Sequence, residues 1–163
     1  MNIRLAERAD GAAVAEVHIE GRNAYYNGHV DVETLDRRAA QLRGIYGDMP
    51  TRFDRNLWCA EVDGEIVGMA LVGPPQEWLG PWVGELYQIH VRPDHWRRGI
   101  GSALHEACMG AWRAGGITVG VVEVWSRNDR AQAFYESHGW RADGHTRPGP
   151  AGTEYVRLRR TIL

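Results

Sequence analysis

The chain contains no lysine, since all 19 of its basic residues are arginine. The phosphate-binding loop of P-loop nucleotide hydrolases requires a lysine, so this class of protein is excluded. Cysteine is scarce as well, and Cys59 and Cys108 lie far apart in apolar surroundings. This pattern argues against a disulfide framework or a zinc knuckle, and it predicts two buried thiols in a reducing compartment.

Long apolar runs and a strong net charge are also missing. No stretch approaches the ~18 apolar residues of a membrane-spanning helix, and the N-terminal MNIRLAERAD carries charges where a signal peptide requires an apolar run. A net charge of −2 gives no general attraction to nucleic acid or to an anionic membrane. We therefore expect a cytoplasmic protein that binds neither, and whose partners are small molecules or peptides.

The chain does contain enough apolar residues for a core, 44% of the total, which predicts one domain over residues 1–163. The clearest local signal is a hairpin in which two apolar runs meet at Asp63-Gly64, a dipeptide typical of a tight primed turn. Loops are expected at 23–29, 74–82 and 146–152. Strands are expected at 3–5, on both sides of the 63–64 turn within 57–73, at 83–91, 118–125 and 154–160, and before the last loop.

Helices are expected from about 10 to 21, at 31–44, from the glycines near 100 to Gly115-Gly116, and at 129–138. This order predicts an α/β fold with a mixed central sheet of about six or seven strands flanked by helices. Strands 83–91 and 118–125 are joined through a helix, so we expect them to be parallel.

The stretch HVRPDHWRRGIGSALHE combines positive charge with glycine at the start of a helix. A helix N-terminus has unpaired backbone N–H groups and a partial positive charge, which together favour an anion. Gly99 and Gly101 leave those groups uncovered, Arg97 and Arg98 add charge, and Ser102 offers a hydroxyl. The pattern indicates a pyrophosphate site, with a solvated basic turn as the alternative, because Gly-x-Gly alone is a weak signal.

A dinucleotide-binding fingerprint is the first specific alternative for this stretch. It would need a small residue at position 104 and an acidic residue at the end of the next strand. Leu104 occupies the first position, and the next strand ends in VEVWSRN. A nicotinamide-dependent enzyme is therefore not expected.

Three motifs in order make the chain similar to the GNAT superfamily of acyl-CoA N-acyltransferases. LYQIHVRPDHWRRGIGSAL resembles the family's strand, proline-containing turn and glycine-rich helix start, with GEL at the head of the same strand. NDRAQAFYESHGW resembles the family's Asn-x-x-Ala-x-x-Phe-Tyr-x-x-x-Gly-Phe segment. Trp96 departs from the family pattern, which often has Gln or Arg there. The resemblance is strongest over 83–140 and extends over the whole chain through the order of elements.

This resemblance implies that acetyl-CoA is the donor substrate. Its pyrophosphate would bind the backbone amides of residues 98–102, and its pantetheine arm would pair with the backbone near residues 89–91, where strands 83–91 and 118–125 splay apart. The resemblance also implies that a backbone N–H near Ile89 holds the developing oxyanion. The residues implied to contact acetyl-CoA are Ile89, His90, Val91, Arg97, Arg98, Gly99, Ile100, Gly101, Ser102, Asn128 and Tyr135.

Acetyl transfer requires a neutral amine, whereas an alkylamine with a pKa of ~10.4 is almost fully protonated at pH 7. A general base is therefore needed, and the resemblance implies Glu85, acting directly or through a water. The departing thiolate needs a proton, because a thiol has a pKa of ~8.5. The resemblance implies that Tyr135 supplies it. The structural alternatives are a surface or edge carboxylate for Glu85, a core aromatic for Tyr135 and a helix cap alone for Asn128.

The resemblance places the acceptor amine between three loops. Aromatic and acidic side chains there would suit a cationic amine. The side chains in these loops are Tyr25, Tyr26, Asp31 and Glu33, then Glu77, Trp78 and Trp82, and finally His145 and Arg147.

We therefore predict an acetyl-CoA-dependent N-acetyltransferase that acts by direct transfer in a ternary complex. The acceptor would be a small amine, an amino acid, an antibiotic or a protein N-terminus. The alternative function is a non-catalytic acyl-CoA-binding module of the same fold. For the oligomeric state, the sequence leaves a homodimer open. No metal is expected, because His90, His95 and His105 cross from strand to loop to helix without a ligand pattern.

Overall fold

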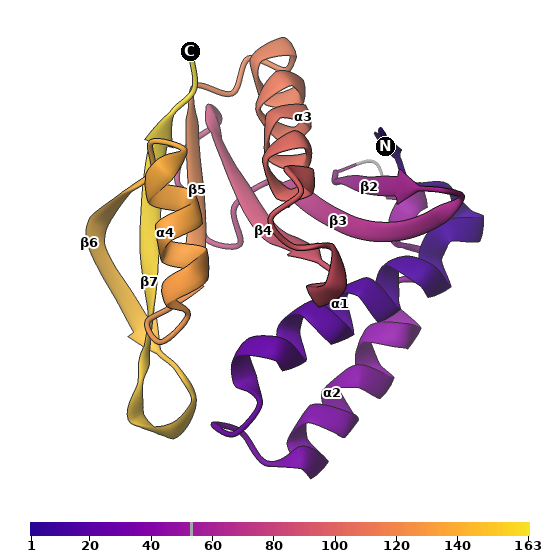
Figure 1. Ribbon diagram of the computed structural model, residues 1–163. Helices are drawn as coiled ribbons and strands as arrows, with labels where there is room; N and C mark the ends of the chain where they lie inside the picture. The colour runs from indigo at the N-terminus through magenta and orange to yellow at the C-terminus, as the bar shows by residue number, and fades with distance from the viewer. Residues whose placement is uncertain (53) are drawn as a thin grey trace.

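The computed structural model describes residues 1–52 and 54–163. Within them, seven strands form one mixed sheet in the order β1-β2-β3-β4-β5-β7-β6, in which only β4 and β5 are parallel neighbours (Figure 1). The α/β fold expected from the sequence is confirmed. The strands are β1 (Asn2–Leu5), β2 (Asn56–Val62), β3 (Glu65–Gly73), β4 (Val83–Val91), β5 (Val119–Trp125), β6 (Arg141–Pro148) and β7 (Glu154–Thr161).

Helices cover both faces of this sheet (Figure 1). Successive side chains of a strand point to opposite faces, and the pairing of β3 with β2 skips Val67, which shifts the alternation by one residue, so β3 contributes to two cores. Its Val67 and Ala70 pack with α3, whereas Ile66 and Met69 pack with α1 and α2 on the other face. The helices of the described residues are α1 (Gly11–Tyr26), α2 (Val32–Ile45), α3 (Ile100–Ala114) and α4 (Asp129–Ser137).

Most predicted boundaries agree with the structure. The hairpin turns at Asp63 and Gly64, which have the positive φ values of a primed turn, 52° and 82°. Strand β4 has the predicted bounds, and α3 ends before the predicted glycine pair Gly115-Gly116. The predicted parallel pair is also confirmed.

Two predicted loops are partly wrong. Residues 23–26, predicted as loop, form the last turn of α1, because the Tyr26 ring is buried against Trp125. Residues 146–148, predicted as loop, continue β6 and pair with β7. In both places contacts with distant parts of the chain outweigh the local turn signal.

The parallel strands are held together at their start by glycines under one indole. A Cβ added to Gly84 would lie 2.6 Å from Cε2 of Trp112, and one added to Gly120 would lie 2.5 Å from Cζ3 of the same side chain. Only glycine fits at these two positions, because Trp112 of α3 lies directly on the backbone. The close packing fixes the point from which β4 and β5 diverge.

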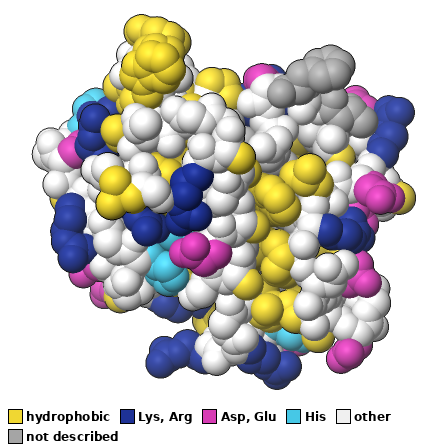
Figure 2. All heavy atoms as spheres, turned by 90° about the horizontal axis from the view of Figure 1, so that it is seen from above, with side chains coloured by type: hydrophobic (Ala, Val, Ile, Leu, Met, Phe, Trp, Pro, Cys, Tyr) yellow, Lys and Arg dark blue, Asp and Glu magenta, His cyan; other side chains and the backbone are white. Residues whose placement is uncertain are grey.

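None of the helices in the described residues is long and apolar enough to cross a membrane. Basic and acidic side chains are interspersed on the face seen in Figure 2, with hydrophobic side chains between them. This face therefore offers no continuous surface of one charge.

Candidate active site

A large cleft opens where β4 and β5 separate. The two strands pair only from Val83 to Glu85 and from Val119 to Val121, and they then diverge toward α1 (Figure 1). A register shift against β3 leaves Tyr87 as an extra residue, a bulge that bends β4 at this point. The cleft has a volume of about 1350 Å³ and receives side chains from both helical layers.

The far half of β4 presents an unpaired backbone edge to the cleft. The Arg92 amide donates to the Val67 carbonyl at 2.8 Å, so His90 and Arg92 turn their backbone groups toward β3. Since the direction alternates along an antiparallel strand, Ile89 and Val91 turn theirs toward the gap. This is the edge along which an extended ligand can add as a further strand.

Trp96, the departure from the family pattern, has a defined role in the structure. Its indole Nε1 donates to the Val91 carbonyl at 2.7 Å, and the Arg130 guanidinium lies 3.2 Å from the centre of its ring. The carbonyl retains one lone pair, and the Val91 N–H is untouched. Trp96 therefore connects the end of β4 to α4 and brings a cation to the cleft wall.

The start of α3 has the geometry expected for an anion site. Gly99 adopts a φ of +79° at the helix N-cap, and a Cβ there would meet no atom within 4 Å. The first amides of α3 have no acceptor within the helix, so they can bind oxygen atoms of a ligand. Arg97 lines the cleft, whereas Arg98 is not on its wall and instead donates to the Asp94 carbonyl at 3.0 Å.

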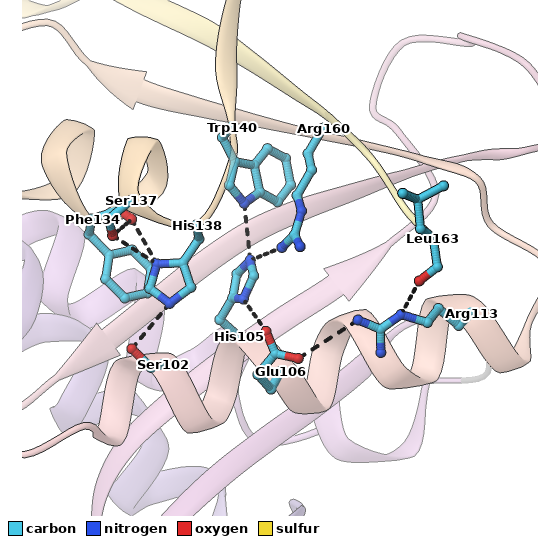
Figure 3. Close-up of polar contacts among 10 residues, drawn as sticks. All are labelled: Ser102, His105, Glu106, Arg113, Phe134, Ser137, His138, Trp140, Arg160 and Leu163. Carbon is cyan, nitrogen blue, oxygen red and sulfur yellow. Dashed lines mark hydrogen bonds and ion pairs between the residues drawn. The ribbon is translucent and has the colours of Figure 1, made fainter.

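Ser102 is held by a polar network behind the cleft (Figure 3). His138 Nδ1 donates to the Phe134 carbonyl at 2.8 Å, because a carbonyl can only accept. In the neutral ring Nε2 is then an acceptor, and it lies 3.1 Å from Ser102 Oγ. The Ser102 hydroxyl thus donates to His138, and only its oxygen lone pairs face the cleft.

Next to this pair lies a fully buried histidine (Figure 3). His105 Nε2 accepts from the Trp140 indole at 3.0 Å, with the Arg160 guanidinium 3.2 Å away. Burial, together with the nearby His138 ring and the Arg160 guanidinium, lowers the pKa of His105 to about 4. It is therefore a neutral packing residue of α3, which it connects to Trp140 after α4.

Glu85 is the last residue of β4 that pairs with β5, and the two strands separate directly after it. Its side chain accepts from the Gln76 backbone amide at 2.7 Å and from the Gln76 side-chain amide at 3.2 Å. Burial raises the pKa of this carboxyl, and the charge of Glu123 raises it further, while the hydrogen bonds from Gln76 oppose the shift. The alternative of a surface carboxylate is wrong, because Glu85 is only 8% exposed.

The other predicted side chains come from α4. Tyr135 lines the cleft and is buried, and burial raises the pKa of its phenol, which keeps it protonated. Asn128 Oδ1 accepts from the Ala131 amide at 3.1 Å, which confirms the helix cap. Both side chains also border the cleft. The arrangement brings a hydroxyl donor, a buried carboxylate and the start of α3 to one cavity.

The predicted acceptor side chains divide into two groups. Tyr25, Tyr26 and Arg147 line the cleft. Asp31 caps α2 through the Thr34 amide instead. Glu33, Trp78 and Trp82 are exposed outside the cleft, while Glu77 and His145 border a smaller neighbouring pocket.

Several residues of the cleft were not predicted from the sequence. Gln76 orients Glu85, and Glu123 of β5 ion-pairs with Arg147 of β6. Glu123 is the one charged residue in the otherwise apolar strand VGVVEVW, and this isolated charge could have marked it in the sequence as a candidate site residue. Arg22 and Arg38 also reach the cleft, from α1 and α2, without any local pattern that marks them.

Sequence comparison identifies the family. The profile of the acetyltransferase (GNAT) family matches residues 23–140. The chain belongs to this family. The predicted acyltransferase class of this GNAT protein is thereby confirmed, together with its fold.

Relatives of this GNAT protein carry N-acetyltransferase names. Phosphinothricin N-acetyltransferase of Streptomyces viridochromogenes is 28% identical over 154 residues, 90% of this chain and 78% of that protein. An uncharacterized N-acetyltransferase of Archaeoglobus fulgidus is 28% identical over 145 residues, 86% of this chain and 93% of that one. The PaiA N-acetyltransferase from Thermoplasma acidophilum, solved in complex with coenzyme A, shares the fold with a TM-score of 0.78 at 16% identity, over 98% of both chains.

Proposed function

We propose that this GNAT protein transfers the acetyl group of acetyl-CoA directly to the nitrogen of a primary amine while both substrates are bound. The observation that carries the proposal is the separation of β4 and β5 beyond Glu85. It places an unpaired strand edge, a helix start suited to an anion and a buried carboxylate around one cleft. The N-acetyltransferase names of the relatives and the coenzyme A bound to a protein of the same fold support it.

The cleft residues fit acetyl-CoA at two places. A diphosphate fits the amides of residues 100–102, with Gly99 leaving them uncovered and the Arg97 side chain at the rim. The amide groups of a pantetheine arm fit the outward-facing backbone of Ile89 and Val91. His90 would contribute only its position in the strand, because its ring stacks 4.5 Å from His18.

When bound, acetyl-CoA supplies a thioester whose carbonyl carbon forms a bond to the amine nitrogen while the carbon–sulfur bond breaks. In the proposed reaction Glu85 accepts the proton that the amine loses, directly or through one water. The raised pKa of Glu85 makes its carboxylate a stronger base than an exposed one. The Tyr135 hydroxyl donates a proton to the departing sulfur, and the backbone N–H of Ile89 faces the developing oxyanion.

The acceptor is proposed to be a small amine, an amino acid, an antibiotic or a protein N-terminus. We infer this range from the volume of the cleft, about 1350 Å³, and from the relative named for phosphinothricin. The cytoplasmic location, the single-domain organisation and a homodimer stay predictions. The buried free thiols Cys59 and Cys108 agree with the first of these.

Two measurements on the purified protein test the proposal. Titration calorimetry with acetyl-CoA should give a dissociation constant below millimolar, and weaker binding would contradict the donor site. A thiol-release assay over a panel of amines should then show CoA release that depends on the acceptor. Tight binding without acceptor-dependent release would identify a non-catalytic acyl-CoA-binding module instead.

A further inference from the structure

The part of the cleft between Glu85 and the helices α1 and α2, here called the acceptor half, carries charges of opposite sign on separate walls. Glu85 and Glu123 come from the two splayed strands, and Arg147 is already bound to Glu123. Arg22 and Arg38 come from α1 and α2 on the opposite helical layer. The cleft is thus negative at the splay and positive on the side of the helices.

The two helical arginines have no carboxylate partner among the described residues. The Arg22 guanidinium lies 4.6 Å from the centre of the Tyr26 ring, and Arg38 donates only to the neutral Gln41 amide at 3.1 Å. By contrast, the next residue along α2, Arg37, ion-pairs with Glu33 at 3.1 Å. Within residues 1–52 and 54–163, therefore, no carboxylate forms an ion pair with Arg22 or Arg38.

Both arginines act on the same part of the cleft. His18 is buried there, with its Nδ1 2.7 Å from the Tyr46 hydroxyl. Its pKa lies well below the usual value, mainly through burial, with additional lowering by His90, Arg22 and Arg38. The positive field of both guanidinium groups thus reaches the floor of the cleft, where low polarity strengthens it.

A third arginine lies close to Glu85. Arg55 packs over the Tyr87 ring at 4.7 Å, and its charge acts on the Glu85 carboxyl. Its Nε is buried without a hydrogen-bond partner. Asp54, 3.8 Å away, is already bound by Arg52 at 3.0 Å. Arg55 therefore brings a third positive charge to this part of the cleft, together with one buried N–H donor that has no hydrogen-bond partner among the described residues.

A cationic acceptor without an anionic group would meet mainly repulsion on this side. The loop carboxylates expected to attract such an acceptor, Asp31 and Glu33, bind within α2 instead. Guanidinium groups bind carboxylate and phosphorus oxyanions through paired hydrogen bonds. Arg22 and Arg38 can supply such hydrogen bonds to an anionic group of the acceptor.

We propose that the acceptor is a small zwitterion, with its amine at Glu85 and a carboxylate, phosphonate or phosphinate group toward Arg22 and Arg38. This assignment rests on the proposed transferase function and specifies its substrate class. The acetyl transfer is the same: the amine nitrogen gains the acetyl group and loses a proton, while the anionic group takes no part in bond making.

Matched pairs of acceptors test the assignment. Amino acids are compared with their α-amides and with the corresponding decarboxylated amines, and aminophosphonates with their uncharged esters, in the acetyl-CoA thiol-release assay. For the wild-type protein, kcat/KM should be at least about tenfold higher for the anionic member of a pair. The carboxylate and phosphonate arms identify which anionic group is preferred.

Three variants then assign the effect to residues. Arg38→Gln and Arg22→Gln should each reduce the ratio of kcat/KM for anionic over neutral acceptors by about tenfold or more, because one paired contact is lost. Arg37→Gln is the matched control, since that arginine lies beside Arg38 but points to the exposed Glu33, and it should keep the wild-type ratio. Circular dichroism verifies that each variant is folded.

The outcomes separate this assignment from the proposed function. Equal or faster turnover of the neutral amines would overturn the zwitterion and leave the transferase standing. An unchanged ratio in both Arg22→Gln and Arg38→Gln would also overturn it. Absence of CoA release with every member of the panel would contradict the proposed function and the assignment together.

Discussion

Replacement of Glu85 by Gln is the sharpest test of the proposed chemistry. The amide keeps the shape of the side chain and still accepts from the Gln76 backbone amide, which lies 2.7 Å from the carboxylate. It removes the basicity and turns one acceptor oxygen into a donor, to which the Gln76 side-chain amide can present its oxygen by rotating. General bases contribute roughly 100-fold or more to rate, so kcat/KM should fall by at least that factor, about 2.7 kcal/mol in activation free energy.

The pH dependence of the same variant gives a second readout. Burial raises the pKa of Glu85, so wild-type kcat/KM should fall as the pH drops through a value above the ordinary range of a glutamate. In Glu85→Gln this dependence on the carboxyl should disappear, which leaves only the rise of the rate with pH as more of the amine becomes neutral.

The stability of the variant has a predictable sign. An acid whose pKa is raised by folding stabilises the native state at low pH, and this contribution is lost as the pH rises through the folded pKa. Glu85→Gln should therefore be at least as stable as the wild type at pH 7, so a loss of activity cannot be assigned to unfolding.

Glu136→Gln, an exposed change on α4, is the control for the activity measurement. A fall of less than about threefold, or an unchanged pH profile, would refute Glu85 as the base.

Three further predictions concern α4 and the strand pair. Tyr135→Phe should lower kcat by about tenfold or more with little change in the acetyl-CoA dissociation constant, and unchanged turnover would remove it as the acid. Asn128→Ala should cost about 1 kcal/mol in urea unfolding through loss of the Ala131 cap, and an unchanged midpoint would contradict this. Gly120→Ala should cost about 1–3 kcal/mol, because its Cβ would lie 2.5 Å from Trp112, whereas Gly110→Ala, with no neighbour within 4 Å, should not.

The part of the site predicted best from the sequence is local. The start of α3, the bounds of β4 and the Asn128 cap follow from glycine, proline and side-chain capping signals within a few residues. These signals act in the isolated chain, so they survive in the folded one. The geometry of this helix start could be predicted because the residues that form it are consecutive.

The acceptor half could not be predicted in the same way. Arg38 and Glu123 come from different layers, and nothing in their local sequence indicates that both border one cleft. Asp31 was expected to face a substrate, yet a short acidic side chain before a helix binds the helix amides more readily. Helix α1 extends to Tyr26 because the ring of Tyr26 packs against Trp125 and its hydroxyl bonds to the hydroxyl of Tyr155, both of which are distant in the sequence.

The central claim is that the cleft between β4 and β5 transfers acetyl groups to an amine. Its most direct test supplies acetyl-CoA with a ¹³C-labelled acetyl group and follows the label by mass spectrometry and NMR while free CoA is counted. The account predicts one labelled N-acetyl amide for each CoA released, in the wild-type protein and at least about 100-fold more slowly in Glu85→Gln. CoA release as free acetate, or label transfer that is equally fast in the variant, would contradict it.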